Sequence, residues 1–225
     1  MQGDLTKGPI TSTMLRFALP MMAGNLLQQC YNVADTLIVG QYLGSDALAA
    51  VGSAYTLMTF LTSILLGLCM GSGAVFSICQ GAGDEKKLHS SMAASFLLVA
   101  AVTLALNGAV FLLLDLILLF LQAEGVVYTM MREYLRVIFA GLVGIFLYNF
   151  FAALLRSLGN STVPLAFLAV SAGLNILLDL WFVAGLGRGV AGAAEATVIS
   201  QYVSGIGIAA YTWRRFPALF RRDPA

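Results

Sequence analysis

Charged residues are scarce in this sequence: only 10% of its 225 residues are Asp, Glu, Lys or Arg, whereas 60% are hydrophobic. A soluble domain typically carries about 25% charged residues, so this balance indicates a chain whose surroundings are mostly lipid. The formal net charge is +1, which gives no indication of a nucleic-acid partner.

Cysteine and histidine are also few. The three cysteines, Cys30, Cys69 and Cys79, lie in apolar runs, and their spacing fits neither a disulfide framework nor a metal site. The single histidine, His89, lies in a charged loop, so no span offers the serine–histidine pair of an intramembrane protease. Because the sequence offers no nucleophile–base pair and no metal cluster, we expect no enzymatic activity and no cofactor.

Six apolar stretches are each long enough to cross a bilayer, which takes about 20 helical residues. None has the polar–apolar alternation, about ten residues long, of outer-membrane barrel strands. The first stretch is too long for a cleavable signal peptide, and it contains Pro20 and Asp35. We therefore predict an all-α membrane protein, a single six-helix transmembrane bundle that covers residues 1–225. The predicted spans are 14–40, 47–79, 91–121, 127–157, 163–186 and 190–213.

Basic residues lie mostly on one side of these spans. Loops rich in Lys and Arg stay in the cytoplasm, according to the positive-inside rule. Nine of the twelve basic residues fall on the side that holds both termini, so both termini are expected in the cytoplasm. The nine residues are Lys7, Arg16, Lys86, Lys87, Arg156, Arg214, Arg215, Arg221 and Arg222.

Polar residues recur inside the spans at helical spacing. In lipid, an organised set of polar side chains indicates a cavity or a pathway. The first, fifth and sixth spans each carry such residues three or four positions apart, and therefore on one helical face. The fourth span carries two that lie within about 60° of each other on a continuous helix. These residues are Asn25, Gln28, Asn32 and Asp35, then Ser171, Asn175 and Asp179, then Thr197, Gln201 and Ser204, and in the fourth span Tyr134 and Asn149.

Two of these polar residues are carboxylates. Desolvation penalises the ionised form of a carboxylate, so Asp35 or Asp179 can hold a proton near neutral pH. A bound sodium ion can instead supply the positive charge, with carboxylate, amide and hydroxyl oxygens as ligands. Both alternatives stay open. The acidic residues Asp115 and Glu195 lie near the outer ends of their spans, where water can solvate them and where Arg188 can reach Glu195.

Five segments with recognisable motifs occur in order along the chain. The first contains Ala18-Leu-Pro20 and continues through Tyr31–Gly40 (YNVADTLIVG). The others are Leu43–Gly52 (LGSDALAAVG), Leu155–Asn160 (LRSLGN), Leu174–Asp179 (LNILLD) and Gly189–Gln201 (GVAGAAEATVISQ). Together they resemble the multidrug and toxic compound extrusion (MATE) transporters, closest to the prokaryotic DinF-like branch. The resemblance covers nearly all of the chain and corresponds to the N-terminal six-span lobe.

The resemblance implies a secondary active efflux transporter of the bacterial plasma (inner) membrane. Such a transporter exports organic cations or drugs by alternating access, in antiport with protons or sodium ions. In that branch the N-terminal lobe holds the cation site. The residues that match the proton or sodium site are Asp35, Asn175, Asp179 and Thr197. The supporting polar residues are Gln28, Tyr134 and Asn149, to which the polar face of the first span adds Asn32.

Two departures from the family are visible. Many relatives have proline directly after the fifth-span aspartate, where this chain has Leu180. The family also has twelve spans in two lobes, whereas this chain has six. We therefore expect a protein partner, which is either a second six-span lobe or a second copy of this chain in a homodimer. Of these, we favour a half-length chain that needs a second lobe. The other expected partners are the bilayer and small amphipathic or cationic substrates. The alternatives are a lipid-linked precursor flippase of the same superfamily, which would favour a cationic cavity, and a non-transporting membrane subunit or scaffold.

Overall fold

The computed structural model describes residues 9–220 of the chain. Lys7, Arg221 and Arg222, used above for the orientation, lie outside this range. The described residues form long helices and no strand, which confirms the predicted all-α fold. The α-helices are α1 (Ile10–Leu43), α2 (Ser45–Gly81), α3 (Glu85–Phe120), α4 (Gly125–Ile138), α5 (Leu142–Ser157), α6 (Thr162–Asp179) and α7 (Gly189–Arg215).

Two of the predicted spans are not uniform α-helix. The fourth consists of α4 and α5 joined by a 3-10 turn, η1 (Phe139–Gly141). The fifth consists of α6 followed by a π-helix, η2 (Leu180–Gly185). A further 3-10 turn, η3 (Pro217–Phe220), follows α7. Within residues 9–220 the helices therefore make six columns, as the sequence predicted.

Four of the columns are long and apolar enough to cross a membrane by length and composition. They are Ser45–Gly81, Glu85–Phe120, Gly125–Ser157 and Thr162–Gly185. The remaining two, α1 with 34 residues and α7 with 27, have the required length. Both carry polar faces, which lower their mean hydropathy.

The helices extend beyond the apolar stretches because backbone hydrogen bonding continues until a cap ends it. The start of α3 illustrates this: the Asp84 carboxylate accepts a hydrogen bond from the Lys87 backbone N–H (2.9 Å), the usual role of an N-cap. The helix thus begins six residues before the predicted span at 91. Hydropathy predicts the part of a helix that faces lipid, whereas capping chemistry sets where the helix begins.

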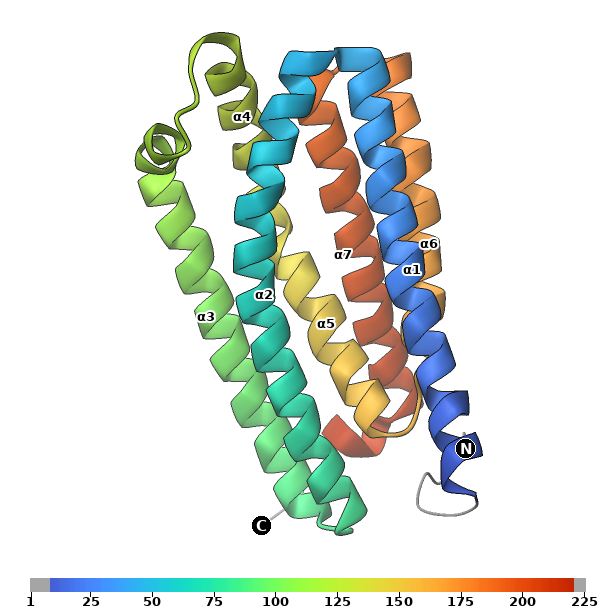
Figure 1. Ribbon diagram of the computed structural model, residues 1–225. Helices are drawn as coiled ribbons and strands as arrows, with labels where there is room; N and C mark the ends of the chain where they lie inside the picture. The colour runs from blue at the N-terminus through green and yellow to red at the C-terminus, as the bar shows by residue number, and fades with distance from the viewer. Residues whose placement is uncertain (1–8, 221–225) are drawn as a thin grey trace.

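The helix α7 lies inside the bundle, packed against α4, α5 and α6, while α2 packs against α3, α4 and α5. The column α1 packs mainly on α6, and the two run side by side in Figure 1. Both ends of the described chain lie at the same end of the bundle (Figure 1). Polar faces of α1, α6 and α7 are in this way brought together against α2, α4 and α5.

Glycines allow the closest of these contacts, between α5 and α7. A Cβ atom on Gly205 would come within 2.7 Å of the Gly144 carbonyl oxygen, and one on Gly144 within 3.0 Å of the Gln201–Tyr202 backbone. Such distances leave no room for a methyl group. The two backbones therefore approach each other as in small-residue packing of membrane helices.

Candidate functional site

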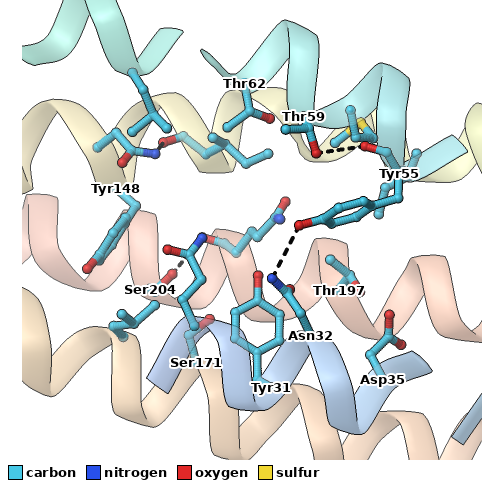
Figure 2. Close-up of a pocket in the computed structure, with 18 of the residues that line it drawn as sticks. Tyr31, Asn32, Asp35, Tyr55, Thr59, Thr62, Tyr148, Ser171, Thr197 and Ser204 are labelled. Atoms are coloured by element: carbon cyan, nitrogen blue, oxygen red, sulfur yellow. Dashed lines mark hydrogen bonds between the residues drawn. The ribbon is translucent and has the colours of Figure 1, made fainter. Parts of the chain in front are cut away.

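A cavity of about 260 Å³ lies between α1, α2, α4, α5, α6 and α7. Six of the eight predicted site residues line it. Three further lining residues, Ser171, Gln201 and Ser204, come from the predicted polar faces. The six are Gln28, Asn32, Asp35, Tyr134, Asn149 and Thr197. Figure 2 shows Asp35 and Thr197 at one side of the cavity, Tyr148 and Ser204 at the other, and Tyr31 and Asn32 between them.

The other two predicted residues, Asn175 and Asp179, lie behind the cavity wall. Asn175 is 2% exposed and Asp179 is completely buried. The Asp179 carboxylate nevertheless meets the Asp35 carboxylate, which reaches it from α1. The structure thus joins the two aspartates that the sequence places in different spans.

Four oxygen atoms at this point are buried without a hydrogen-bond partner: Oδ1 of Asp35, Oδ1 of Asn175 and both carboxylate oxygens of Asp179. Two ionised carboxylates can only accept hydrogen bonds, so they cannot satisfy each other. A proton on either one would supply the missing donor. A sodium ion would be an equally good partner, since it prefers oxygen ligands.

Asn175 and Thr197 complete this group from α6 and α7. The Asn175 amide Nδ2 donates to Thr197 Oγ1 (3.2 Å), and the Thr197 hydroxyl donates to the Ala193 carbonyl (3.1 Å). These bonds leave Asn175 Oδ1 as the acceptor without a partner. Within residues 9–220, no three His, Cys, Asp or Glu side chains gather into a metal-binding group. The donor set therefore suits a proton or a sodium ion better than a transition metal.

Two tyrosines lie next to the carboxylates. Tyr134, on α4, is buried and within electrostatic reach of both Asp35 and Asp179. Tyr31, on α1, lies one helical turn before Asp35 and lines the cavity with it. The carboxylate pair therefore interacts electrostatically with a residue of α4, so a change in its charge acts on α4 as well as on α1 and α6.

At the other side of the cavity, most polar side chains donate their hydrogen bonds to the backbone. The Tyr148 hydroxyl donates to the Pro164 carbonyl (3.0 Å), the Asn149 amide to the Ile145 carbonyl (2.8 Å) and the Ser171 hydroxyl to the Ser200 carbonyl (3.0 Å). Their oxygen atoms remain available as acceptors. This part of the cavity is polar and carries no formal charge.

The second span supplies cavity residues that the sequence reasoning missed. Tyr55, Thr59, Thr62 and Ser63 line the cavity from α2. The hydroxyls of Thr59 and Ser63 donate to backbone carbonyls one turn earlier (2.8 and 2.7 Å). Their spacing of four, three and one residues keeps them on one helical face. The sequence contains this pattern, but hydroxyl residues alone are only a weak indication of a cavity-lining face in a membrane helix.

The peripheral charges pair with one another away from the cavity. Arg188 and Glu195 form an ion pair with a shortest N–O distance of 2.7 Å, which confirms the predicted contact. Asp115 pairs with Arg132 at 3.0 Å, and its side chain is 68% exposed. Neither acidic residue contributes to the cavity.

The MatE family model matches residues 20–181, which include Asp35, Asn175 and Asp179. The chain belongs to the MatE family. Among its curated relatives is YpnP of Bacillus subtilis, a probable multidrug resistance protein; it is 32% identical over 201 residues, 89% of this chain and 45% of YpnP. The multidrug export protein MepA of Staphylococcus aureus is 31% identical over 206 residues, 89% of this chain and 44% of MepA. This MatE chain spans about half the length of the curated relatives it matches.

Solved structures of the family agree with this fold. A crystal structure of a MATE protein in the bent conformation has a TM-score of 0.86 and 28% identity, over 97% of this chain and 50% of that one. An outward-facing multidrug resistance MATE transporter of the MOP superfamily also has a TM-score of 0.86, with 29% identity over 94% of this chain and 46% of that one. In both cases about half of the solved chain is matched.

Proposed function

We propose that this chain is one lobe of a secondary active efflux transporter that exports amphipathic organic cations in antiport with protons or sodium ions. Its relatives YpnP and MepA carry multidrug resistance and multidrug export in their names. The geometry of the chain itself supplies a reason for such an activity, because its cavity adjoins a buried pair of carboxylates.

The observation that carries the proposal is the contact between Asp35 and Asp179 and the unpartnered oxygens around it. Two buried negative charges in contact are unstable unless a cation neutralises them. A proton or a sodium ion bound by Asp35, Asn175, Asp179 and Thr197 would do so. Binding would also lower the negative charge at the cavity wall, which weakens the attraction for a cationic substrate. Exchange of one cation for the other is the basis of antiport.

The cavity suits a cationic, amphipathic substrate. Its lining residues include Asp35 and no Lys or Arg, so a phosphate-bearing lipid would find no counter-charge there. Four tyrosines contribute aromatic faces, which attract organic cations. These four are Tyr31, Tyr55, Tyr134 and Tyr148.

A partner is needed to close the cavity toward α2. Tyr55 is 53% exposed, and Thr59 and Ser63 are also exposed although they line the cavity. Polar helix faces are costly in contact with lipid. A second six-span lobe, or a second copy of this chain, would cover this face and provide the opposite wall for alternating access.

The proposed location is the bacterial plasma membrane with both termini in the cytoplasm. Both ends of the described chain lie at one end of the bundle, as this orientation requires (Figure 1). The same end holds the start of α3, whose first turn carries Lys86 and Lys87. The positive-inside rule favours a cytoplasmic position for that end.

The test is ion-dependent stability of the purified chain in detergent. If the coupling ion is sodium, replacing choline by sodium at constant ionic strength should raise the unfolding temperature. If it is the proton, lowering the pH from 8 to 5.5 should raise the unfolding temperature. A ligand at 100 times its dissociation constant stabilises the folded state by about 2.7 kcal/mol. Asp179→Asn should remove the ion dependence and raise the unfolding temperature without ions, because it removes one of two buried like charges.

Asp115→Asn is the matched control, since Asp115 is exposed and distant from the cavity. It should keep the ion dependence of the wild type. If Asp179→Asn retained the full response to sodium and to pH, the cation site would not be where we propose it.

A further inference from the structure

The fourth column is interrupted where it passes the cavity. The 3-10 turn at Phe139–Gly141 separates α4 from α5, and Figure 1 shows α5 continuing below α4 at a slant. Residues on both sides of the turn line the cavity: Tyr134 and Ile138 before it, Ile145 and Asn149 after it. The angle between α4 and α5 therefore helps to set the shape of the cavity.

Glycine accounts for the position of this interruption. A Cβ atom at position 141 would lie 2.7 Å from Oε1 of Gln201 and 3.1 Å from Cγ2 of Val198, both on α7. The turn thus lies directly on α7 because Gly141 has no side chain. The Gln201 oxygen that lies against it is buried and has no hydrogen-bond partner, so this contact is not a strong attachment.

Two side chains from other helices hold the turn in place. Asn107, on α3, donates from Nδ2 to the Phe139 carbonyl (2.8 Å), which also accepts the backbone N–H of Leu142. Tyr202, on α7, donates from its hydroxyl to the Ala140 carbonyl (2.8 Å). Consecutive carbonyls of the turn are therefore bound from two helices. Neither Asn107 nor Tyr202 lines the cavity.

The part of the column before the turn carries Tyr134 to the carboxylate pair. Tyr134 is within electrostatic reach of Asp35 and Asp179, and lies about one and a half helical turns before Phe139. A change in the charge of the pair changes the environment of the Tyr134 phenol. If the column bends at η1, α4 can tilt in response to this change in charge while α5 stays packed on α7.

We infer that η1 is a hinge and that Asn107 and Tyr202 are positioning residues that limit its angle. The hinge lets α4 respond, through Tyr134, to the cation bound at Asp35 and Asp179, and so changes the cavity. This coupling rests on the function proposed above, whereas the hinge itself is a property of the fold. A side-chain hydrogen bond between membrane helices changes an equilibrium by about threefold, so each bond is weak enough to break during transport.

The experiment measures distances between nitroxide labels by pulsed electron paramagnetic resonance, on the full chain with Cys30, Cys69 and Cys79 replaced. One label pair, Val126 on α4 and Leu186 after η2, spans the hinge, and both positions are exposed. The reference pair, Leu48 and Leu186, does not. Asn107→Leu and Tyr202→Phe should each broaden the Val126–Leu186 distribution and leave the reference pair unchanged. Each should also change the affinity for a fluorescent organic cation by about threefold.

Tyr42→Phe is the control for the loss of a tyrosine hydroxyl, because Tyr42 is exposed at the end of α1. It should change neither the distances nor the affinity. Distributions that superimpose on the wild type in both hinge variants would overturn the inference. Equal broadening of both label pairs would also overturn it, because that result indicates general loosening.

The response to ions separates this inference from the proposed function. Sodium or acidic pH should shift the Val126–Leu186 distance in the wild type, and Tyr134→Phe should abolish the shift. If the ions stabilise the chain but move no label, the proposed function stands and the hinge is wrong. If the ions have no effect on stability but the positioning variants still broaden the distribution, the hinge stands and the proposed function is wrong.

Discussion

The Asp35 carboxylate on α1 meets the Asp179 carboxylate on α6, with Asp179 completely buried. The contact exists because the first and fifth columns pack side by side, although three other columns separate them in the sequence. Polar side chains lie near each aspartate, so the pair forms the centre of a group of polar residues from α1, α4, α6 and α7. Buried like charges are costly to maintain, and such a cost is typical of functional sites in membranes.

The orientation in the membrane can be tested by cysteine labelling in intact cells. In a cysteine-free version, cysteines at Ser45 and Gln122 should react with a membrane-impermeant reagent added outside. Ser45 is the first residue of α2 and Gln122 lies between α3 and α4, both at the end of the bundle opposite the termini. A cysteine at Gly83, between α2 and α3, should not react. The reverse pattern would contradict the proposed orientation.

The requirement for a partner can be tested by co-expression in a drug-sensitive host. The chain alone should give no drug export, because the exposed face of α2 that lines the cavity has no opposite wall. Co-expression with the C-terminal lobe of a MATE relative should restore export. Robust export by the chain alone, together with a cross-linked dimer, would instead identify a second copy as the partner.

The close packing of α5 on α7 gives a prediction about stability. Gly205→Ala places a methyl group 2.7 Å from the Gly144 carbonyl oxygen, so the two backbones must separate. Overpacking of this kind costs about 1–3 kcal/mol, which should appear as a lower midpoint in a denaturant titration. The control is Gly67→Ala, because nothing lies within 4 Å of a Cβ at that position. It should not lower the stability, because alanine is the better helix former in a helix interior. Equal losses from both substitutions would show that packing is not the cause.

The columns of the fold could be predicted from hydropathy, but the irregular parts could not. The 60° estimate for Tyr134 and Asn149 assumed a continuous helix, whereas η1 interrupts it, and both residues still reach the cavity. Leu180 replaces the proline seen in many relatives, yet the helix is irregular there, because the π-helix begins at this residue. Both irregular segments contact α7, and η1 also contacts α3, and hydropathy does not encode such contacts.

The glycines show the same limit. The spacing of Gly67 and Gly71 is typical of close helix packing. No atom lies within 4 Å of a Cβ built on either one, and the close contact is made by Gly144 and Gly205 instead. A motif in one helix predicts a small surface, but the partner helix decides whether anything packs on it. By contrast, the predicted polar faces supply nine of the twenty residues that line the cavity, because the cost of exposing polar groups to lipid acts on each helix separately.

The role of the carboxylate pair in transport is tested by substituting each aspartate in a reconstituted two-lobe transporter. Asp35→Asn and Asp179→Asn keep the shape of the side chain and remove its charge. Each should abolish export driven by a proton or sodium gradient while the protein stays folded, because an amide cannot bind and release the coupling cation. The measurement is efflux of a fluorescent organic cation from proteoliposomes with and without the gradient.

Asp115→Asn is the control for this experiment, since it removes the same charge from a side chain that is 68% exposed and paired with Arg132. An exposed ion pair contributes about 0–1 kcal/mol, so export should remain largely intact. Equal loss of export from all three substitutions would mean that they act by destabilising the helix bundle. Loss of export in the Asp35 and Asp179 variants alone would mean that export depends on the environment of the carboxylate pair, which the contact between α1 and α6 provides.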